Sequence, residues 1–405
     1  MLPVPSPDSP ASWLRLAASL AVGTVACVGM WSVVVVLPLV QAEFGTARAG
    51  ASLPYTAMML GFAAGTMIMG RIADRHGIVA PIVLATVLLC AGYVAAAFAP
   101  TLWTFALAHG LLIGVGAAAG FAPLMADISH WFVKRRGLAV VLAACGNYLA
   151  GVVWPLALNH AVPAMGWRNA HLAIAIFIPC VLLPLVPLFS RKMPKMAMAS
   201  AEAATAANLG RLGISANGLQ AVLSLAGFGC CMAMSMPQVH LVAYCGDLGY
   251  GVARGAEMLA MMLALGIVSR IGSGFLADRI GGAATLAAGS FMQMAALTLY
   301  LWFDGLTSLY IISGIFGLFQ GGIVPMYAVI IRDYLPPKEA GVRIGIVISA
   351  TIFGMALGGW SAGWIFDTFA SYRMAFLHGI LWNLVNLSVV AWLLLRQRAG
   401  RVAAA

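Results

Sequence analysis

Apolar residues occur along this chain in long continuous runs that are separated by short polar segments. Each run holds about 20 residues, enough for an α-helix to cross a hydrocarbon core of roughly 30 Å. The runs do not alternate between apolar and polar positions, so they do not predict the strands of a β-barrel. The twelve predicted spans are residues 14–39, 51–70, 79–99, 103–126, 138–162, 168–189, 218–245, 255–277, 283–303, 306–331, 342–366 and 372–395.

This pattern predicts an all-α integral membrane protein, and the composition agrees with it. Of the 405 residues, 62 % are hydrophobic and only 8 % are charged, far outside the range of soluble domains. The seven cysteines all fall in predicted spans, and their spacing matches no metal or redox motif. We therefore expect buried thiols and no cofactor.

The net charge of +10 is explained by topology. Most Lys and Arg residues fall on one side of a twelve-span zigzag, and this side also holds both termini. The opposite side carries only Arg48, Arg168, Arg254 and Arg373. By the positive-inside rule the basic side is cytoplasmic, so we expect both termini in the cytoplasm and the protein in a bacterial cell inner membrane. Nucleic-acid binding is not expected.

Two copies of one motif lie half the chain apart, GRIADRHG at Gly70–Gly77 and GFLADRIG at Gly274–Gly281. Such self-similarity indicates a duplicated unit of six spans. The predicted order is a cytoplasmic tail, a six-helix bundle, a polar and basic cytoplasmic linker, a second six-helix bundle and a second tail. These parts comprise residues 1–13, 14–189, 190–217, 218–395 and 396–405.

A six-plus-six repeat with G-x-x-x-D-R-x-G between the second and third spans resembles the major facilitator superfamily. The resemblance covers nearly the whole chain and implies the major facilitator fold, in which two bundles rock about a central site near the bilayer midplane. No Gly-rich phosphate loop follows a predicted strand, so ATP-driven transport is not supported. We expect a carrier driven by gradients and not an enzyme.

Arg270 is the one basic residue that the predicted topology leaves inside the membrane. It lies about 12 Å along a helix from Asp278, at a depth where a cation costs at least ~2.5 kcal/mol. The twelve Asp and Glu residues fall in loops, tails or span ends, so none lies at this depth. Two roles are open: binding of an anionic substrate through the guanidinium fork, or structural pairing with backbone carbonyls.

His240, in SMPQVHLVAYCGDLG near the outer end of the seventh span, is a second candidate. Pro237 is expected to break the helix just before it, and broken helices in transporters line cavities. Because a histidine titrates near neutral pH, His240 is also the candidate proton carrier near Arg270. The alternative is a hydrogen-bonded core residue.

The segment WFVKRRGLAVVLAACG, Trp131–Gly146, looks like the fourth-to-fifth-span signature of monocarboxylate transporters and their oxalate/formate antiporter relatives. This resemblance implies that Arg270 binds a substrate carboxylate and that His240 borders the site. The sequence departs from the family pattern in three places, and the last departure bears on the proton-coupling chemistry. The first span lacks the acid of the animal members, Val141 replaces a glycine, and Gly266 stands where many members have Asp or Asn.

One cation favours one carboxylate, because a dicarboxylate would need a second positive residue. The eleventh span offers only Arg343, at its cytoplasmic end. The favoured substrate is therefore a small monocarboxylate of the lactate or pyruvate kind, moved with a proton or in exchange for another anion. Further candidate wall residues are Trp31, Tyr55, Asn147, Tyr148, Gln320, Tyr327, Phe353 and Trp360.

The repeated loops also predict a gate on the cytoplasmic side. Related carriers pair the loop acid with the start of the fifth span in the other half, and a carboxylate is stabilised near a helix N-terminus. By this analogy Asp74 meets Arg343 or the start of the eleventh span when that side is closed, and Asp278 meets Arg136 or the start of the fifth span. The remaining gating candidates are Arg75 and Arg279.

Other functions fit the pattern less well. An efflux carrier for an antibiotic or other organic compound is the alternative, but GNYLAGVVWP matches the efflux G-x-x-x-G-P run only loosely. A sensor would need a signalling domain, and a membrane-embedded hydrolase would need clustered carboxylates or metal ligands in the spans. The expected partners are the carboxylate, a proton or counter-anion and the lipid bilayer, and a monomer is expected.

Overall fold

The computed structural model describes residues 8–132, 135–190, 209–210, 212–335 and 337–402. In this part of the chain twelve helical spans are long and apolar enough to cross a membrane, which confirms the all-α membrane fold. The first six spans are built from α1 (Pro10–Ala26), α2 (Val28–Glu43), α3 (Arg48–His76), α4 (Val79–Ala97), α5 (Leu102–Leu107), η1 (Ala108–Gly114), α6 (Val115–Ala117), η2 (Ala118–Gly120), α7 (Ala122–Trp131), α8 (Arg136–Met165) and α9 (Trp167–Phe189). The last six spans are built from α11 (Ala216–Asp247), α12 (Val252–Ile280), α13 (Gly282–Trp302), α14 (Leu306–Gln320), α15 (Ile323–Tyr334), α16 (Pro337–Phe369) and α17 (Tyr372–Val402).

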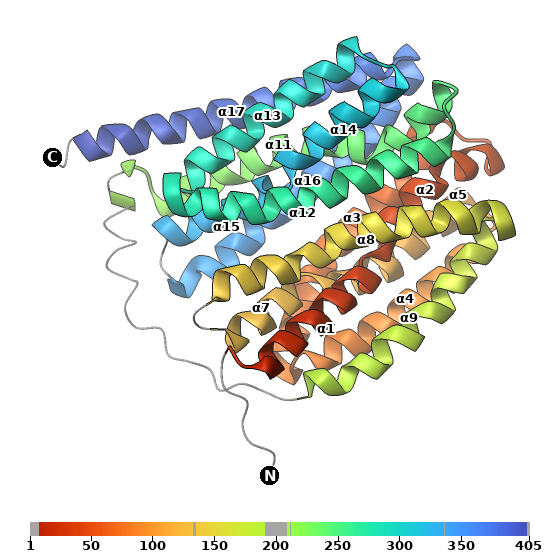
Figure 1. The fold of residues 1–405 in the computed structure, drawn as a ribbon, viewed down its shortest axis with the longest axis horizontal. Coiled ribbons are helices and arrows are strands. Elements are labelled where there is room, and N and C mark those ends of the chain that lie inside the picture. The colour runs from red at the N-terminus through yellow and green to blue at the C-terminus, as the bar shows by residue number, and fades with distance from the viewer. Residues whose placement is uncertain (1–7, 133–134, 191–208, 211, 336, 403–405) are drawn as a thin grey trace.

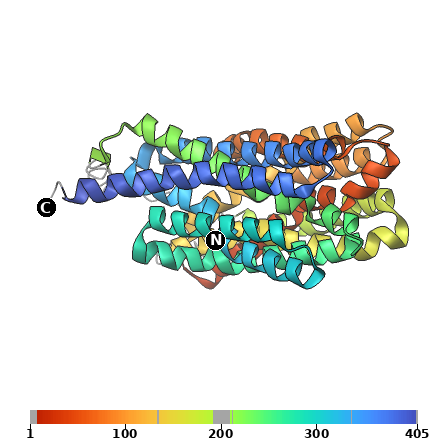
Figure 2. The same ribbon diagram turned by 90° about the horizontal axis from the view of Figure 1, so that it is seen from above.

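The two halves of the chain form two bundles of helices. Figure 1 shows the first half, α1 to α9, below the second half, α11 to α17. Seen from above in Figure 2, the helices of both bundles run along one common direction. One cluster of buried apolar residues is centred on the first half, and another is confined to the second. The bundles meet where α3 packs along α16 and α8 packs along α12.

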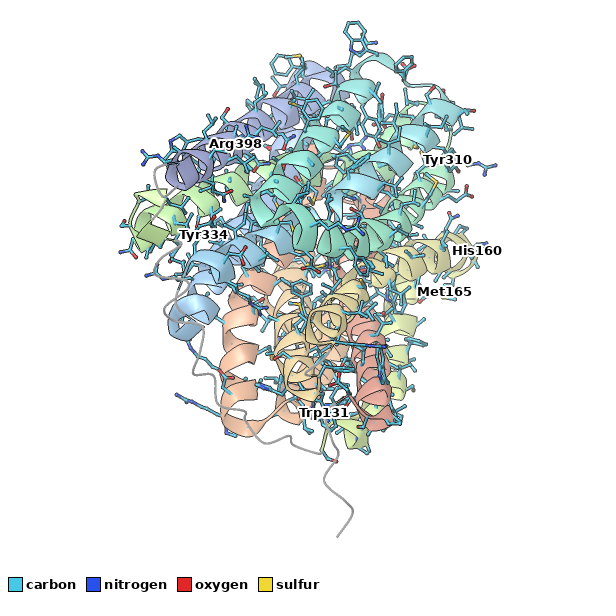
Figure 3. All side chains as sticks on the ribbon, turned by 60° about the vertical axis from the view of Figure 1, so that its left-hand side comes forward. Trp131, His160, Met165, Tyr310, Tyr334 and Arg398 are labelled. Atoms are coloured by element: carbon cyan, nitrogen blue, oxygen red, sulfur yellow. The ribbon has the colours of Figure 1, made fainter. Side chains whose placement is uncertain are left out.

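The helices begin and end at two opposite ends of the molecule. Figure 3 shows Trp131 and Tyr334 toward one end and His160 toward the other. We call the first the Asp74 end, because it holds the two repeated loops. The second is called the Arg48 end, because α3 begins there.

The repeated motif forms the same helix end twice. Helix α3 ends at His76 and α12 ends at Ile280. The following residues, Gly77 and Gly281, have φ values of 83° and 87°, a region that favours glycine because it has no Cβ. The backbone conformation at both loops therefore favours the last glycine of the motif, Gly77 in one copy and Gly281 in the other.

Three spans are interrupted. The first is divided at Cys27, the fourth contains the π-helix η1, and the tenth is divided between α14 and α15 at residues 321–322. By contrast, α11 runs through Pro237 without a break, so the break expected there is wrong. A proline removes only one backbone donor, and the neighbouring helices of a membrane bundle allow the helix to continue.

The predicted linker at 190–217 falls mainly on residues 191–208 and 211, which lie outside the described residues. After it, α11 begins at Ala216, close to the predicted start at 218. The Oγ of Ser215 accepts a hydrogen bond of 3.0 Å from the backbone N–H of Gly218 and so caps the helix.

Candidate functional site

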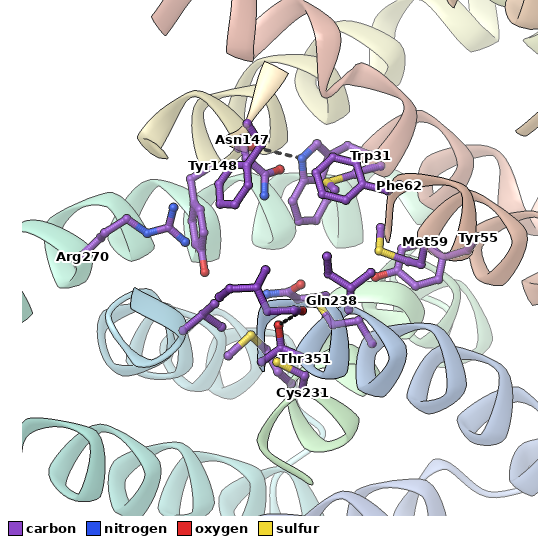
Figure 4. Close-up of a pocket in the computed structure, with 17 residues that line it drawn as sticks. Trp31, Tyr55, Met59, Phe62, Asn147, Tyr148, Cys231, Gln238, Arg270 and Thr351 are labelled. Atoms are coloured by element: carbon purple, nitrogen blue, oxygen red, sulfur yellow. Dashed lines mark hydrogen bonds between the residues drawn. The ribbon is translucent and has the colours of Figure 1, made fainter. Parts of the chain in front are cut away.

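A cavity lies between the two bundles, and helices of both halves supply its walls. It encloses about 690 Å³ of empty space, including the part open to solvent, and its lining is predominantly apolar. Figure 4 shows Arg270 and Tyr148 toward one end of this cavity and Tyr55, Met59 and Phe62 toward the other. The lining residues are Met30, Trp31, Tyr55, Met59, Phe62, Phe121, Asn147, Tyr148, Cys231, Met234, Gln238, Arg270, Val324, Ile348, Thr351, Ile352 and Met355.

Arg270 is the only charged residue among the described residues of this lining, and it is 4 % exposed. Its Nη1 donates to the carbonyl oxygen of Ala144 at 2.8 Å, and its Nε donates to that of Gly321 at 3.1 Å. Within the described part of the chain, no carboxylate forms an ion pair with it, and its further side-chain partner is Tyr148. The guanidinium is thus held by neutral groups alone and has no anionic partner among the described residues.

The two carbonyls that bind Arg270 lie in different settings. Gly321 lies in the interruption between α14 and α15, where the regular ladder of helix hydrogen bonds is broken. Ala144 lies on α8, in the other half of the molecule. The bond between Arg270 and Ala144 therefore links the two bundles beside the cavity.

Tyr148 covers the guanidinium from the side of α8. The Cζ of Arg270 lies 4.1 Å from the centroid of the Tyr148 ring, in the range of a cation–π contact. This ring occupies the space next to Gly266, where an added Cβ would overlap Tyr148. The glycine that departs from the family pattern thus makes room for the aromatic cover of Arg270.

We predict that Gly266→Ala displaces Tyr148 and weakens carboxylate binding. Loss of a desolvated cation–π contact is worth about 0.5 to 2 kcal/mol, or roughly twofold to thirtyfold in affinity. The matched control is Gly272→Ala on the same helix, where an added Cβ meets nothing within 4 Å. Titration of both purified variants with one monocarboxylate measures the effect, and equal affinities would contradict this role of Gly266.

Several of the predicted wall residues lie together. The Nε1 of Trp31 donates to the backbone oxygen of Asn147 at 3.0 Å, which joins α2 to α8 at the cavity. The Oδ1 of Asn147 is buried without a hydrogen-bond partner among the described residues. Figure 4 shows this amide beside Tyr148, so it offers a second polar contact near Arg270.

Other predicted residues lie elsewhere. His240 is fully buried, and its ring nitrogens face the backbone oxygen of Gly359 at 2.8 Å and the hydroxyl of Tyr372 at 3.3 Å. Tyr327 is buried within the second half, where its hydroxyl donates to the Oδ1 of Asn386 at 3.0 Å. Phe353 is 48 % exposed. The structure therefore places none of His240, Tyr327 and Phe353 in the lining of the cavity.

Two further wall candidates, Gln320 and Trp360, are also absent from the lining. Gln320 lies behind it, because its Oε1 accepts a hydrogen bond of 2.7 Å from the Nε2 of the lining residue Gln238. Trp360 is 37 % exposed. In their place the structure adds apolar residues that the sequence did not single out. These are Met30, Met59, Phe62, Phe121, Met234 and Met355.

A set of contacts not expected from the sequence joins the two halves at the Arg48 end. The Nη2 of Arg48 lies 3.0 Å from both carboxylate oxygens of Asp247 on α11. The carboxylate of Asp367 on α16 accepts bonds of 2.8 and 2.7 Å from the backbone N–H groups of Arg48 and Ala49. Arg48 is only 6 % exposed. We call Arg48, Asp247 and Asp367 the clasp.

The predicted gating residues lie at the opposite end and are not engaged across the two halves. Asp74, Arg75, Asp278 and Arg279 are exposed, and no ion pair or hydrogen bond of these side chains is found among the described residues. The expected contacts across the Asp74 end are therefore not present with the clasp closed, and the cytoplasmic gate stays a prediction.

Of the two arginines expected to pair with Asp74 and Asp278, the structure describes the side chain of Arg343 only. The Nη1 of Arg343 donates to Asn217 at 3.0 Å and to Gln220 at 2.7 Å, both on α11 of its own half. The side chain of Arg136 lies outside the described residues.

Comparison with known proteins gives a family match over most of the chain. The model of the Major Facilitator Superfamily matches residues 20–315 and 273–404. An MFS-type transporter of Gibberella moniliformis is 26 % identical over 76 % of this chain and 74 % of its own length. Monocarboxylate transporter 13 of Bos taurus is 25 % identical over 77 % of this chain and 72 % of its own. The fujikurins efflux protein of Gibberella fujikuroi is 28 % identical over 74 % and 65 %.

Solved structures show the same fold at lower identity. A bacterial homologue of the human lysosomal transporter Spinster, in an inward-facing and unoccupied conformation, has a TM-score of 0.69 at 15 % identity. The similarity covers 98 % of this chain and 97 % of that one. A POT family transporter in complex with 5-aminolevulinic acid also has a TM-score of 0.69, at 12 % identity over 94 % and 95 % of the two chains.

Proposed function

The chain belongs to the major facilitator superfamily of transporters, and on this premise we propose that it is a secondary carrier of a monocarboxylate anion. Lactate and pyruvate are the first substrates to test, since they carry a single carboxylate on a small body. The cavity between the bundles is the proposed binding site, and the substrate is exposed to each side of the membrane in turn.

The observation that carries this proposal is the state of Arg270. A buried guanidinium needs a counter-charge, because an unpaired charge in a membrane interior is costly. In the described structure its partners are two backbone carbonyls and the Tyr148 side chain, and none of these carries a counter-charge. A carboxylate supplies the missing charge, and the Nδ2–H group of Asn147 offers it a further donor.

The position of Arg270 also suggests how binding acts on the two halves. Its bond to Ala144 connects α12 to α8. A carboxylate is a stronger acceptor than a backbone carbonyl, so a bound substrate competes with Ala144 for the guanidinium. We expect this competition to loosen the contact between the bundles and to favour the change of access.

The coupled species is proposed to be a second anion. None of the described lining residues is Asp, Glu or His, the side chains that exchange protons most readily near neutral pH. Proton symport through His240 is the alternative, and it would require that ring to change its contacts with Gly359 and Tyr372. Uptake by anion-loaded vesicles at equal pH supports exchange, whereas uptake only under an imposed pH gradient supports symport.

Counterflow in proteoliposomes tests the proposed function. Vesicles loaded with pyruvate are expected to accumulate labelled lactate, and unlabelled monocarboxylates are expected to compete better than oxalate. The methyl ester of each acid is the matched control, because it keeps the body and removes the charge. Equal competition by acid and ester would favour the second candidate, an efflux carrier for uncharged organic compounds, which the similarity to the fujikurins efflux protein supports.

The proposed orientation places the Asp74 end in the cytoplasm, as the positive-inside rule predicts. A cysteine placed at His76 should then react with impermeant maleimide only from the cytoplasmic face, and one placed at Asp304 only from the outer face. Both positions are exposed, so accessibility reports the side of the membrane alone. Labelling from the opposite faces would reverse the orientation.

A further inference from the structure

One wall of the cavity is a continuous apolar stripe. Tyr55, Met59 and Phe62 follow one another on α3 at spacings of four and three residues, which places them on one face of that helix. All three line the cavity, and Figure 4 shows them at the side away from Arg270. The cavity therefore has a cationic end and an apolar end.

The cavity that contains this stripe is also adaptable in shape. Four methionines, Met30, Met59, Met234 and Met355, come from four different helices and line the same space. Methionine is unbranched and flexible, and it packs against varied apolar shapes.

A three-carbon acid held at Arg270 would leave this stripe uncovered. Apolar surface gains free energy in proportion to the area removed from water, so a longer apolar body would bind more tightly at the same carboxylate contact. No charged or histidine side chain among the described lining residues would oppose such a body at the far end.

We infer that the preferred substrate is amphipathic, with its carboxylate at Arg270 and an apolar body of more than three carbons against Met59 and Phe62. This inference rests on the proposed carboxylate transport and narrows its substrate class. It predicts that lactate and pyruvate are weak ligands and that straight-chain or aryl carboxylates are strong ones.

The test is calorimetric titration of the purified full-length protein with acetate, butyrate and hexanoate. Each buried methylene is expected to tighten binding about fourfold, so hexanoate should bind roughly fifteenfold more tightly than butyrate. Butyrate binding as tightly as hexanoate, or more tightly, would overturn the inference.

A pair of variants on one helix assigns the effect to the stripe. Met59→Gln keeps the length of a buried side chain but makes it polar, and Met67→Gln makes the same change at a position that is 54 % exposed. Met59→Gln should reduce the preference for hexanoate over butyrate severalfold, whereas Met67→Gln should not alter this preference. An unchanged preference in Met59→Gln would overturn the placement of the apolar body.

Methyl hexanoate separates failure of this inference from failure of the proposed function. If the ester binds as tightly as hexanoate, the apolar site stands as a binding site but the carboxylate proposal fails, and the inferred amphipathic acid fails with it. If hexanoate needs its carboxylate but gains nothing over butyrate, the carboxylate proposal stands and the inference alone is wrong. Absence of binding by every acid would overturn both.

Discussion

Replacement of Arg270 by alanine is expected to abolish carboxylate binding, and Arg270→Lys is expected to weaken it tenfold to about a hundredfold. Lysine keeps the charge but cannot hold the carbonyls of Ala144 and Gly321 while presenting a second donor group in the same plane. The loss corresponds to one charge-assisted hydrogen bond, about 1.5 to 3 kcal/mol. Titration of each purified variant with one monocarboxylate measures the difference.

The same variants separate binding from folding. Because Arg270 also satisfies two backbone carbonyls, Arg270→Ala should lower the thermal unfolding temperature somewhat while leaving a folded protein. Arg48→Gln is the control, since it removes another buried arginine that links the halves but lies outside the cavity lining. Retained carboxylate affinity in Arg270→Lys and Arg270→Ala, with lowered stability, would show that this arginine is structural.

Removal of the clasp is expected to open the Arg48 end. In Asp247→Asn the buried guanidinium of Arg48 loses its charged partner, and breaking a buried pair in this way costs about 3 to 5 kcal/mol. The side chain of Asp247 is 36 % exposed, so screening by solvent reduces this cost, and we expect about a tenfold shift in population. The substitution destabilises the closed state, which contains this contact. It leaves the open state unaffected, because the contact is absent there, so the open state gains population.

Accessibility of Cys231 measures the shift, because this native cysteine lines the cavity and is buried with the clasp closed. In a variant that retains Cys231 alone, Asp247→Asn should raise its rate of maleimide labelling from the Arg48 side about tenfold. Glu257→Gln is the matched control, since the Arg254–Glu257 pair lies within one helix and does not join the halves. Equal labelling rates in both variants would mean that the clasp does not hold this end closed.

The spans and the duplicated halves could be predicted because they depend on properties local to the sequence. A run of apolar residues has to be helical in a bilayer, where every backbone group must be satisfied within its own segment. The repeated loop carries its own conformational requirement at Gly77 and Gly281. Arg270 was identifiable for a similar reason, because a cation far from any span end is unusual in any membrane helix.

The walls of the cavity could not be predicted in the same way. Lipid and protein interior are equally apolar, so hydrophobicity does not tell which face of a membrane helix is buried. Phe353 and Met355 lie two residues apart on α16, yet Phe353 is exposed and Met355 lines the cavity. The spacing of Tyr55, Met59 and Phe62 indicates that they share one face of a helix. Many other apolar triplets in these spans have the same spacing, so it does not identify the cavity wall.

The clasp could not be predicted from the sequence. Its three residues are far apart along the chain, and each lies where a charged residue is common in membrane proteins. Arg48 is separated by 199 residues from Asp247 and by 319 from Asp367. Each lies at the end of a span, where charged residues are expected in every membrane protein. Only the packing of α16 against both α3 and α11 brings them together.

Ligand-induced stabilisation of the purified protein tests most directly whether Arg270 binds the substrate carboxylate. Thermal unfolding of wild type and Arg270→Ala is followed with and without a panel of monocarboxylates and their methyl esters. We expect the acids to raise the unfolding temperature of wild type, the esters to do so much less, and neither to stabilise Arg270→Ala. Equal stabilisation of both proteins by the acids would contradict this expectation, because Arg270 would then not touch the substrate.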